Sequence, residues 1–104
     1  GVAYKSDIAD LRESPALDIL AHLRELGAEL EYHDPLVPQV EIEGRTLCSL
    51  ELTPERVRAA DLVVITTAHS AVDYAMVVRE AAHVLDTRNA TKRVANHREK
   101  IRKL

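Results

Sequence analysis

Apolar and charged stretches alternate along the chain, and their spacing predicts alternating strands and helices. The continuous β-branched run at 62–66 is typical of a strand buried on both faces. Ser14 and Thr53 each precede a proline and a helical pattern, which indicates two helix N-termini, and Gly27 is the expected end of the first helix. Strands are predicted at 2–4, 28–33, 62–66 and 83–87, and helices at 14–26, 53–60 and 70–82.

This order of elements predicts an α/β fold, with a parallel sheet of about four strands flanked by helices and joined by right-handed crossovers. Residues 40–48 carry Gly44 near their centre and form either a small hairpin or a loop. The chain has no Trp and no Phe, so its core is built from Val, Leu, Ile and Ala. Such a core suits a thin parallel sheet, and 104 residues suit a single domain.

The formal net charge of -3 conceals two unlike regions. Residues 1–90 hold 8 Lys and Arg against 16 Asp and Glu, whereas residues 91–104 hold 6 basic residues and one acid. The acidic body argues against a nucleic-acid-binding domain. For the basic tail we favour a solvated helix, or a segment lying on the acidic body, over a nucleic-acid or membrane contact. We therefore divide the chain into an α/β domain, 1–90, and a basic C-terminal tail, 91–104.

Several kinds of functional site find no support in the sequence. The three glycines form neither a GxGxxG motif nor a Walker loop, and the five histidines form no metal-binding pair, so we expect no metal site. Cys48, the only cysteine, sits in an apolar stretch and is interpreted as a packed thiol. We predict no catalytic residue in this chain. With no signal peptide and no long apolar run, a cytoplasmic protein without membrane contact is expected.

Polar side chains follow each predicted strand, where parallel sheets bind ligands. Two cations are closest to strand ends, and a lysine with an arginine suits a phosphate-bearing ligand. Ordinary solvated loops would show the same polarity, so the residues alone leave both readings open. The groups are Lys5 after the first strand, His33 and Asp34 after the second, Thr66, Thr67 and His69 after the third, and Arg88 and Asn89 after the fourth.

The opening connection, KSDIADLRE, is longer than most strand-to-helix turns and dense in charge. Long connections of this kind are often retained for binding. Together with HDP at 33–35, ADLVVITTAH at 60–69 and VLDTRN at 84–89, the block GVAYKSDIADLRESPAL resembles the C-terminal domain of the UDP-glucose/GDP-mannose dehydrogenase family. The resemblance covers residues 1–90 and implies a Rossmann-like domain whose first strand is truncated.

The resemblance also implies a function for the whole protein. Enzymes of this family use NAD to oxidise the C6 alcohol of a nucleotide sugar, here a UDP-sugar, to the carboxylate. Their C-terminal domain binds the nucleotide of the sugar, while an N-terminal domain holds most of the NAD. By this resemblance Tyr4, Lys5 and Arg88 bind substrate and Arg12 reaches NAD. Asp7, Asp10 and Glu13 are then expected to hold the loop in shape.

The chain also departs from the family pattern. The family's nucleophilic cysteine belongs to a central segment that has no counterpart here, so the isolated domain is expected to be inactive. The partners implied are the UDP-sugar and the NAD-binding and central domains of the same enzyme. A shortened first strand would expose apolar sheet edges, which predicts a homo-oligomer. The alternative is a stand-alone, non-catalytic α/β module that binds a nucleotide or a protein.

Overall fold

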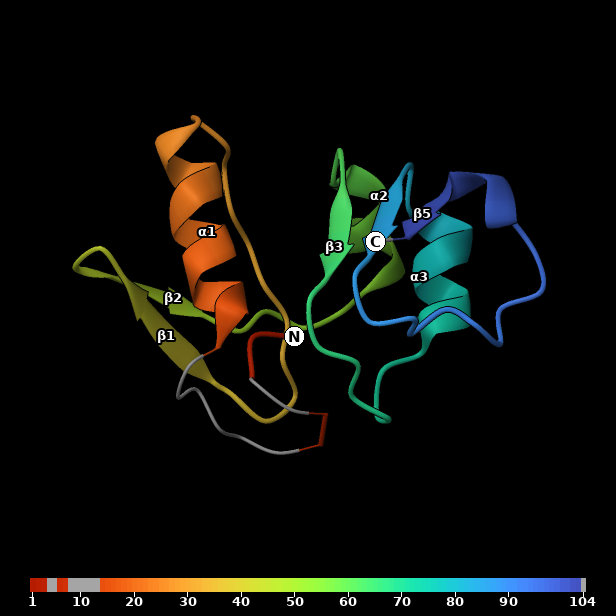
Figure 1. Cartoon of the computed structure of the whole chain (residues 1–104), viewed down its shortest axis with the longest axis horizontal. Coiled ribbons are helices and arrows are strands. Elements are labelled where there is room, and N and C mark those ends of the chain that lie inside the picture. Colours follow the sequence, from red (N-terminus) through yellow and green to blue (C-terminus); the bar gives the residue numbers. More distant parts are fainter. Residues whose placement is uncertain (4–5, 8–13, 104) are drawn as a thin grey trace.

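The computed structural model describes residues 1–3, 6–7 and 14–103, and its elements fall into two groups (Figure 1). One group contains α1 and the β1–β2 hairpin, and the other contains β3, β4, β5, α2 and α3. The N-terminal residues lie between them (Figure 1). Each group has its own apolar cluster, so the region between them is where loops and polar side chains meet.

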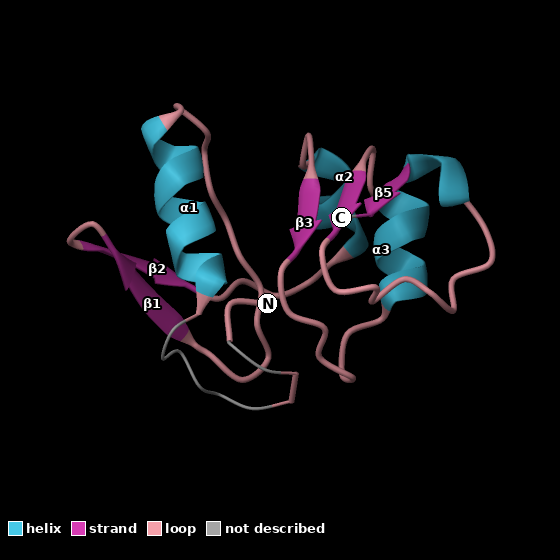
Figure 2. Ribbon diagram, in the orientation of Figure 1, coloured by secondary structure: helices cyan, strands magenta, loops and turns pink. Residues whose placement is uncertain are grey.

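The larger group is a parallel sheet covered by helices (Figure 2). The strand order is β3-β4-β5, with Val63 opposite Val84 and Val84 opposite Ile101. Two helices, α2 and α3, pack against each other and supply Val57 and Met76 to the core of this group. The bounds are α2 Pro54–Ala59, β3 Val63–Ile65, α3 Tyr74–Glu80, β4 Val84–Asp86, a 3-10 turn Arg98–Lys100 and β5 Ile101–Lys103.

The smaller group packs one helix against a hairpin. Helix α1, Pro15–Glu25, buries Ala16 against the inward face of β1, Gln39–Ile42, where Val40 and Ile42 are buried. Strand β2, Arg45–Cys48, pairs antiparallel with β1. The hairpin, one of two structures that the sequence left open for residues 40–48, is therefore present.

The α/β class and the parallel sheet are confirmed, but the membership of the sheet differs from the prediction. Within the described residues the sheet has three strands, and the predicted strand at 28–33 contributes only an isolated bridge between Tyr32 and Ser49. Residues 2 and 3 are not in a strand either, and the structure of residue 4 is outside the described range. The alternation at 28–33 predicts a strand from side-chain pattern alone, whereas a strand also needs a neighbouring backbone to pair with.

Two helix starts behave differently. Thr53 caps α2 as predicted, since its Oγ1 accepts a hydrogen bond from the Arg56 backbone N–H at 3.1 Å. Ser14 occupies the N-cap of α1, but its Oγ donates to the carbonyl of Val2 at 2.6 Å instead of accepting from the helix. The tertiary contact has replaced the local cap, and it ties the start of α1 to the N-terminal residues.

Of the two structures favoured for the C-terminal segment, a solvated helix and a segment lying on the body of the fold, the structure agrees with the second. The segment returns to the sheet as β5, which pairs with β4. Lys100 Nζ donates to the last carbonyls of α3, those of Val78 at 3.3 Å and Arg79 at 2.9 Å, where a cation also complements the helix dipole. Arg98 Nη1 donates to the Thr91 carbonyl at 2.6 Å. These cations hold the segment against the fold; the domain boundary at residue 90 stays a prediction.

The β1–β2 hairpin turns through two residues with positive φ, Glu43 at 51° and Gly44 at 78°, as a type I′ turn requires. A Cβ on Gly44 would touch nothing within 4 Å, so a Gly44→Ala change has only a conformational cost. We expect Gly44→Ala to lower the free energy of unfolding by about 1 kcal/mol. Glu43→Asn should raise it by a few tenths, because Asn tolerates this conformation better. Urea unfolding of both variants measures this, and equal stabilities would contradict the turn assignment.

Strand β3 has β4 on one side and no paired strand on the other among the described residues. Leu62, just before it, is 50% exposed. Unpaired edges with apolar neighbours recruit other chains, so we expect self-association at concentrations of about 100 μM. Light scattering should show a mass above that of one chain, and Leu62→Lys should reduce it. The matched control is Leu26→Lys, at the end of α1, where the leucine is 71% exposed. A single-chain mass throughout would contradict the prediction.

Candidate site at the carboxyl ends of the strands

The buried carboxylate of Asp34 accepts hydrogen bonds from several segments that meet at the carboxyl ends of the strands. It is 2% exposed, and its Oδ2 accepts hydrogen bonds from the backbone N–H groups of Val2 and Ala3 at 2.8 and 3.2 Å. Oδ2 also lies 2.8 Å from Nε2 of His69, and Oδ1 accepts from the Leu36 N–H at 2.9 Å. Asp34 therefore joins the N-terminal residues to the loop after β3.

The surroundings of His69 identify its tautomer. Its Nδ1 accepts a hydrogen bond from the Asp7 backbone N–H at 2.8 Å, so the ring proton is on Nε2 and is donated to Asp34. The Asp7 carboxylate in turn accepts from the backbone and hydroxyl of Ser70, at 2.8 and 3.0 Å. This supports the expected shaping role of Asp7 in the opening loop. Asp10 and Glu13 lie outside the described residues.

The N-terminal residues come very close to the loop after β3. The hydroxyls of Thr66 and Thr67 donate to the carbonyls of Gly1 and Ala3. A Cβ added to Gly1 would lie 2.6 Å from the Thr67 carbonyl oxygen, so only glycine permits this approach. The two threonines, like Asp34 and His69, therefore stabilise the fold through hydrogen bonds within the chain. The sequence predicts all four as polar groups at the edge of the sheet where a ligand binds.

Asp86 shapes the loop after β4. Its Oδ1 accepts from the backbone N–H groups of Arg88 and Ala90, both at 3.0 Å, and its Oδ2 accepts from the Thr91 N–H at 2.9 Å and the Thr91 hydroxyl at 2.6 Å. Asn89 adopts a φ of 57° within this loop. One buried carboxylate therefore turns the chain so that Arg88 and Asn89 face outward at the end of the strand.

A cavity of about 290 Å³ opens at this edge, beside the loops that follow β3 and β4. Arg88 lines it, and the Nε of Arg88 donates to the Thr66 carbonyl at 3.0 Å, which bridges the ends of the two strands. Lys92 and Arg93 line the same cavity. Among the described residues that line it, Asp7 is the only carboxylate, and it already accepts from Ser70. The cavity is cationic and suits an anionic group of phosphate size.

The structure places the predicted site residues unevenly. Arg88 lies at the cavity, while Tyr4, Lys5 and Arg12 fall outside the described residues. Lys92 and Arg93 were missed because their charge was assigned to the tail. Their position six and seven residues past Asp86 was the available signal, since such residues still belong to the strand-end loop.

The prediction of a packed thiol at Cys48 is wrong, because the residue is exposed. Cys48 occupies an outward position of β2, whose inward residue is Leu47, so the apolar surroundings in sequence did not translate into burial. The described part of the chain contains no group of three or more side chains that could hold a metal ion. No described helix is long and apolar enough to cross a membrane.

An open parallel sheet with a cationic cavity at the carboxyl ends of its strands is the arrangement of a nucleotide-binding α/β domain. The sequence model described as "UDP-glucose/GDP-mannose dehydrogenase family, UDP binding domain" matches residues 1–93, and the chain belongs to this family. UDP-glucose 6-dehydrogenase TuaD of Bacillus subtilis (strain 168) is 44% identical over 36 residues. The matched stretch is 35% of this chain and only 8% of that relative. The resemblance inferred from the AYK, LRESPAL and DTRN blocks is confirmed.

Stability at this edge should fall in acid. Burial by itself raises the pKa of Asp34, but hydrogen bonds from Leu36, Val2, His69 and Ala3 outweigh it, so that the pKa lies below its ordinary value near 3.8. The pKa of Asp86 is lowered in the same way, with burial opposed by the hydroxyl and N–H of Thr91 and the N–H groups of Ala90 and Arg88. A lowered pKa contributes stability that is fully present above pH 3.8 and is lost as the pH falls through the folded value.

We therefore expect the free energy of unfolding to decline steeply below about pH 4 in urea titrations. Asp86→Asn should lower it by about 2 kcal/mol at pH 7 and flatten the acid limb, because one of the two carboxylates is then gone. Asp61→Asn, an exposed change just before β3 and outside the helices, is the matched control and should leave both unchanged. An acid limb that is the same in Asp86→Asn and in the parent would contradict this account.

Proposed function

We propose that this chain binds the nucleotide of a UDP-sugar and that the whole enzyme uses NAD to oxidise the sugar's C6 alcohol to the carboxylate. The observation that supports this most is the cationic cavity at the carboxyl ends of β3 and β4. It presents Arg88, Lys92 and Arg93 beside a loop shaped by Asp86. The substrate is UDP-glucose or a UDP-N-acetylhexosamine. Both fit, because the cations bind the diphosphate that these UDP-sugars share.

Each side chain has a distinct task in this proposal. Arg88 offers a planar fork whose position is set by the bond from its Nε to the Thr66 carbonyl, so it reaches phosphate oxygens with little loss of entropy. Lys92 and Arg93 add charge at the cavity rim. Tyr4 and Lys5, from the opening segment, complete the substrate contacts. Asp7 serves as a positioning residue by holding that segment to Ser70.

In this proposal NAD is the hydride acceptor of the whole enzyme. The described residues offer no dinucleotide cradle, since their glycines at positions 1, 27 and 44 do not follow a β-strand of the parallel sheet. NAD is therefore held mainly by another domain, and the contribution of this chain is a single cation, Arg12. The domain alone binds nucleotide sugar without catalysing its oxidation.

The proposal is tested by steady-state kinetics of the full-length enzyme, with UDP-glucose and NAD varied in turn. Lys5→Ala and Arg88→Ala each remove a charge-assisted hydrogen bond of about 1.5–3 kcal/mol, so the KM for the UDP-sugar should rise roughly 10- to 100-fold. The KM for NAD should change far less. Arg12→Ala should show the opposite bias.

Arg56→Ala, on the exposed surface of α2, is the matched control and should leave both constants within about twofold of the parent. Folding of every variant is checked by its thermal transition. Folded Lys5→Ala and Arg88→Ala variants with parental kinetics would show that these cations do not bind the substrate. Retained UDP binding with no oxidation of any UDP-sugar by the full polypeptide would favour the non-catalytic module.

A further inference from the structure

The His69 ring connects two points of the opening segment. The ring is buried, with 1% of the residue exposed, and its Nε2 lies 2.8 Å from Oδ2 of Asp34. The same oxygen accepts a hydrogen bond from the Ala3 N–H at 3.2 Å. On the other side of the ring, Nδ1 accepts from the Asp7 N–H at 2.8 Å. One imidazole therefore anchors the segment at Ala3, through Asp34, and directly at Asp7.

Each anchor has a second attachment to the loop after β3. The Thr67 hydroxyl donates to the Ala3 carbonyl, and Oδ1 of Asp7 accepts from the N–H and the hydroxyl of Ser70 at 2.8 and 3.0 Å. Asp7 has a φ of 60°, in the left-handed region that aspartate and asparagine adopt more readily than most residues. Its N–H is bonded to His69 and its carboxylate to Ser70, so both its backbone and its side chain are held.

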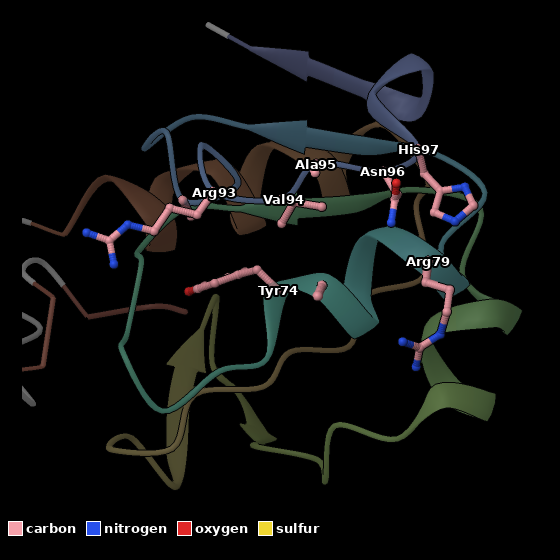
Figure 3. A pocket seen from close by; sticks show the side chains of 9 residues that line it. Tyr74, Arg79, Arg93, Val94, Ala95, Asn96 and His97 are labelled. Atoms are coloured by element: carbon pink, nitrogen blue, oxygen red, sulfur yellow. The ribbon is translucent and has the colours of Figure 1, made fainter.

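The loop that supplies these attachments is itself held at its far end, where α3 begins. Oδ1 of Asp73 accepts from the Met76 N–H at 3.1 Å and caps α3. Val72 and Tyr74 pack against the apolar cluster of the larger group. Figure 3 shows the Tyr74 ring extending from the start of α3 along a second cavity, of about 400 Å³, between α3 and residues 90–97. The loop is therefore a fixed support for the two anchors.

We propose that His69 is a positioning residue for the substrate cation Lys5, an inference that rests on the proposed function. Tyr4 and Lys5 lie between the two anchors in sequence. Holding Ala3 and Asp7 in place lowers the conformational entropy that the residues between them lose when they bind the UDP-sugar. His69 acts through the Asp7 N–H. Its loss is therefore expected to weaken substrate binding even where the protein stays folded.

Two substitutions separate the two bonds of the ring. Asparagine carries an acceptor oxygen at the δ position, where histidine has Nδ1, so His69→Asn keeps an acceptor for the Asp7 N–H and loses the bond to Asp34. Glutamine carries its amide one atom further out, so His69→Gln keeps a donor for Asp34 and leaves the Asp7 N–H without this acceptor. One variant therefore tests the anchor at Asp7, and the other tests the bond that stabilises the buried carboxylate.

The first measurement is steady-state kinetics of the full-length enzyme with UDP-glucose varied. We expect His69→Gln to raise the KM for UDP-glucose about fivefold, with kcat within about twofold of the parent. His69→Asn should keep the KM within about twofold of the parent and show a lower thermal midpoint than His69→Gln. A purely structural role predicts another pattern, because fewer folded molecules lower the apparent kcat and leave the KM unchanged. His22→Gln, an exposed change on α1, is the matched control and should alter neither quantity.

The second measurement needs no UDP-sugar. Trypsin cleaves after lysine and arginine, so the rate of cleavage after Lys5 can be compared with the rate after Arg45, an exposed residue of β2. His69→Gln should raise the ratio of the two rates about threefold or more over that of the parent, because opening is local to the segment that has lost an anchor. His69→Asn and His22→Gln should leave the ratio at the parental value. A general loss of stability would raise both rates together.

The proposal requires both changes in His69→Gln. Parental kinetics or a parental cleavage ratio in that variant would overturn it, and a raised KM alone would mean that the ring acts directly on the ligand, since His69 also lines the strand-end cavity. An equal rise in KM for His69→Asn and His69→Gln would overturn it as well. Parental kinetics of Lys5→Ala would instead overturn the proposed function. An impaired Lys5→Ala beside an unaffected His69→Gln would overturn only the positioning role.

Discussion

The buried carboxylate of Asp34 is the interaction on which the arrangement of the two groups depends. A buried charge is tolerated only when its oxygens are fully hydrogen-bonded, and here backbone N–H groups and the His69 ring provide that compensation. Its donors come from the N-terminal residues and from the loop after β3, which belong to different apolar clusters. The carboxylate therefore sets where the opening loop meets the sheet edge.

A second buried carboxylate, Asp86, performs a parallel task on the other side of the edge. Both carboxylates accept hydrogen bonds from backbone N–H groups and from the side chains of His69 and Thr91. The strand-end cavity can then be positive in a chain whose body is acidic. The two carboxylates are buried within the loops, while Arg88, Lys92 and Arg93 line the cavity. A site built this way attracts anions without requiring a basic protein.

The C-terminal segment shows that like residues can have unlike roles. Arg98 and Lys100 donate to backbone carbonyls and hold β5 and α3 together. Arg93, a few residues away, borders both cavities instead. Charge counting treats these residues as one basic tail. Arg98 and Lys100 lie in the turn that leads into β5, whereas Arg93 lies in the loop before it.

The sequence by itself determined the α/β class, the parallel strands at 63–65 and 84–86, the N-cap of α2 and the family, because these depend on local periodicity, capping chemistry and specific blocks of residues. Only the tertiary structure decided that Ser14 donates to Val2, that Cys48 is exposed and that residues 28–33 do not pair as a strand. It also decided that Asp34 and His69 stabilise the fold, whereas Lys92 and Arg93 border the site. Each of these outcomes depends on which distant backbone or side chain lies opposite, and that is set by packing across the fold and not by neighbours along the chain.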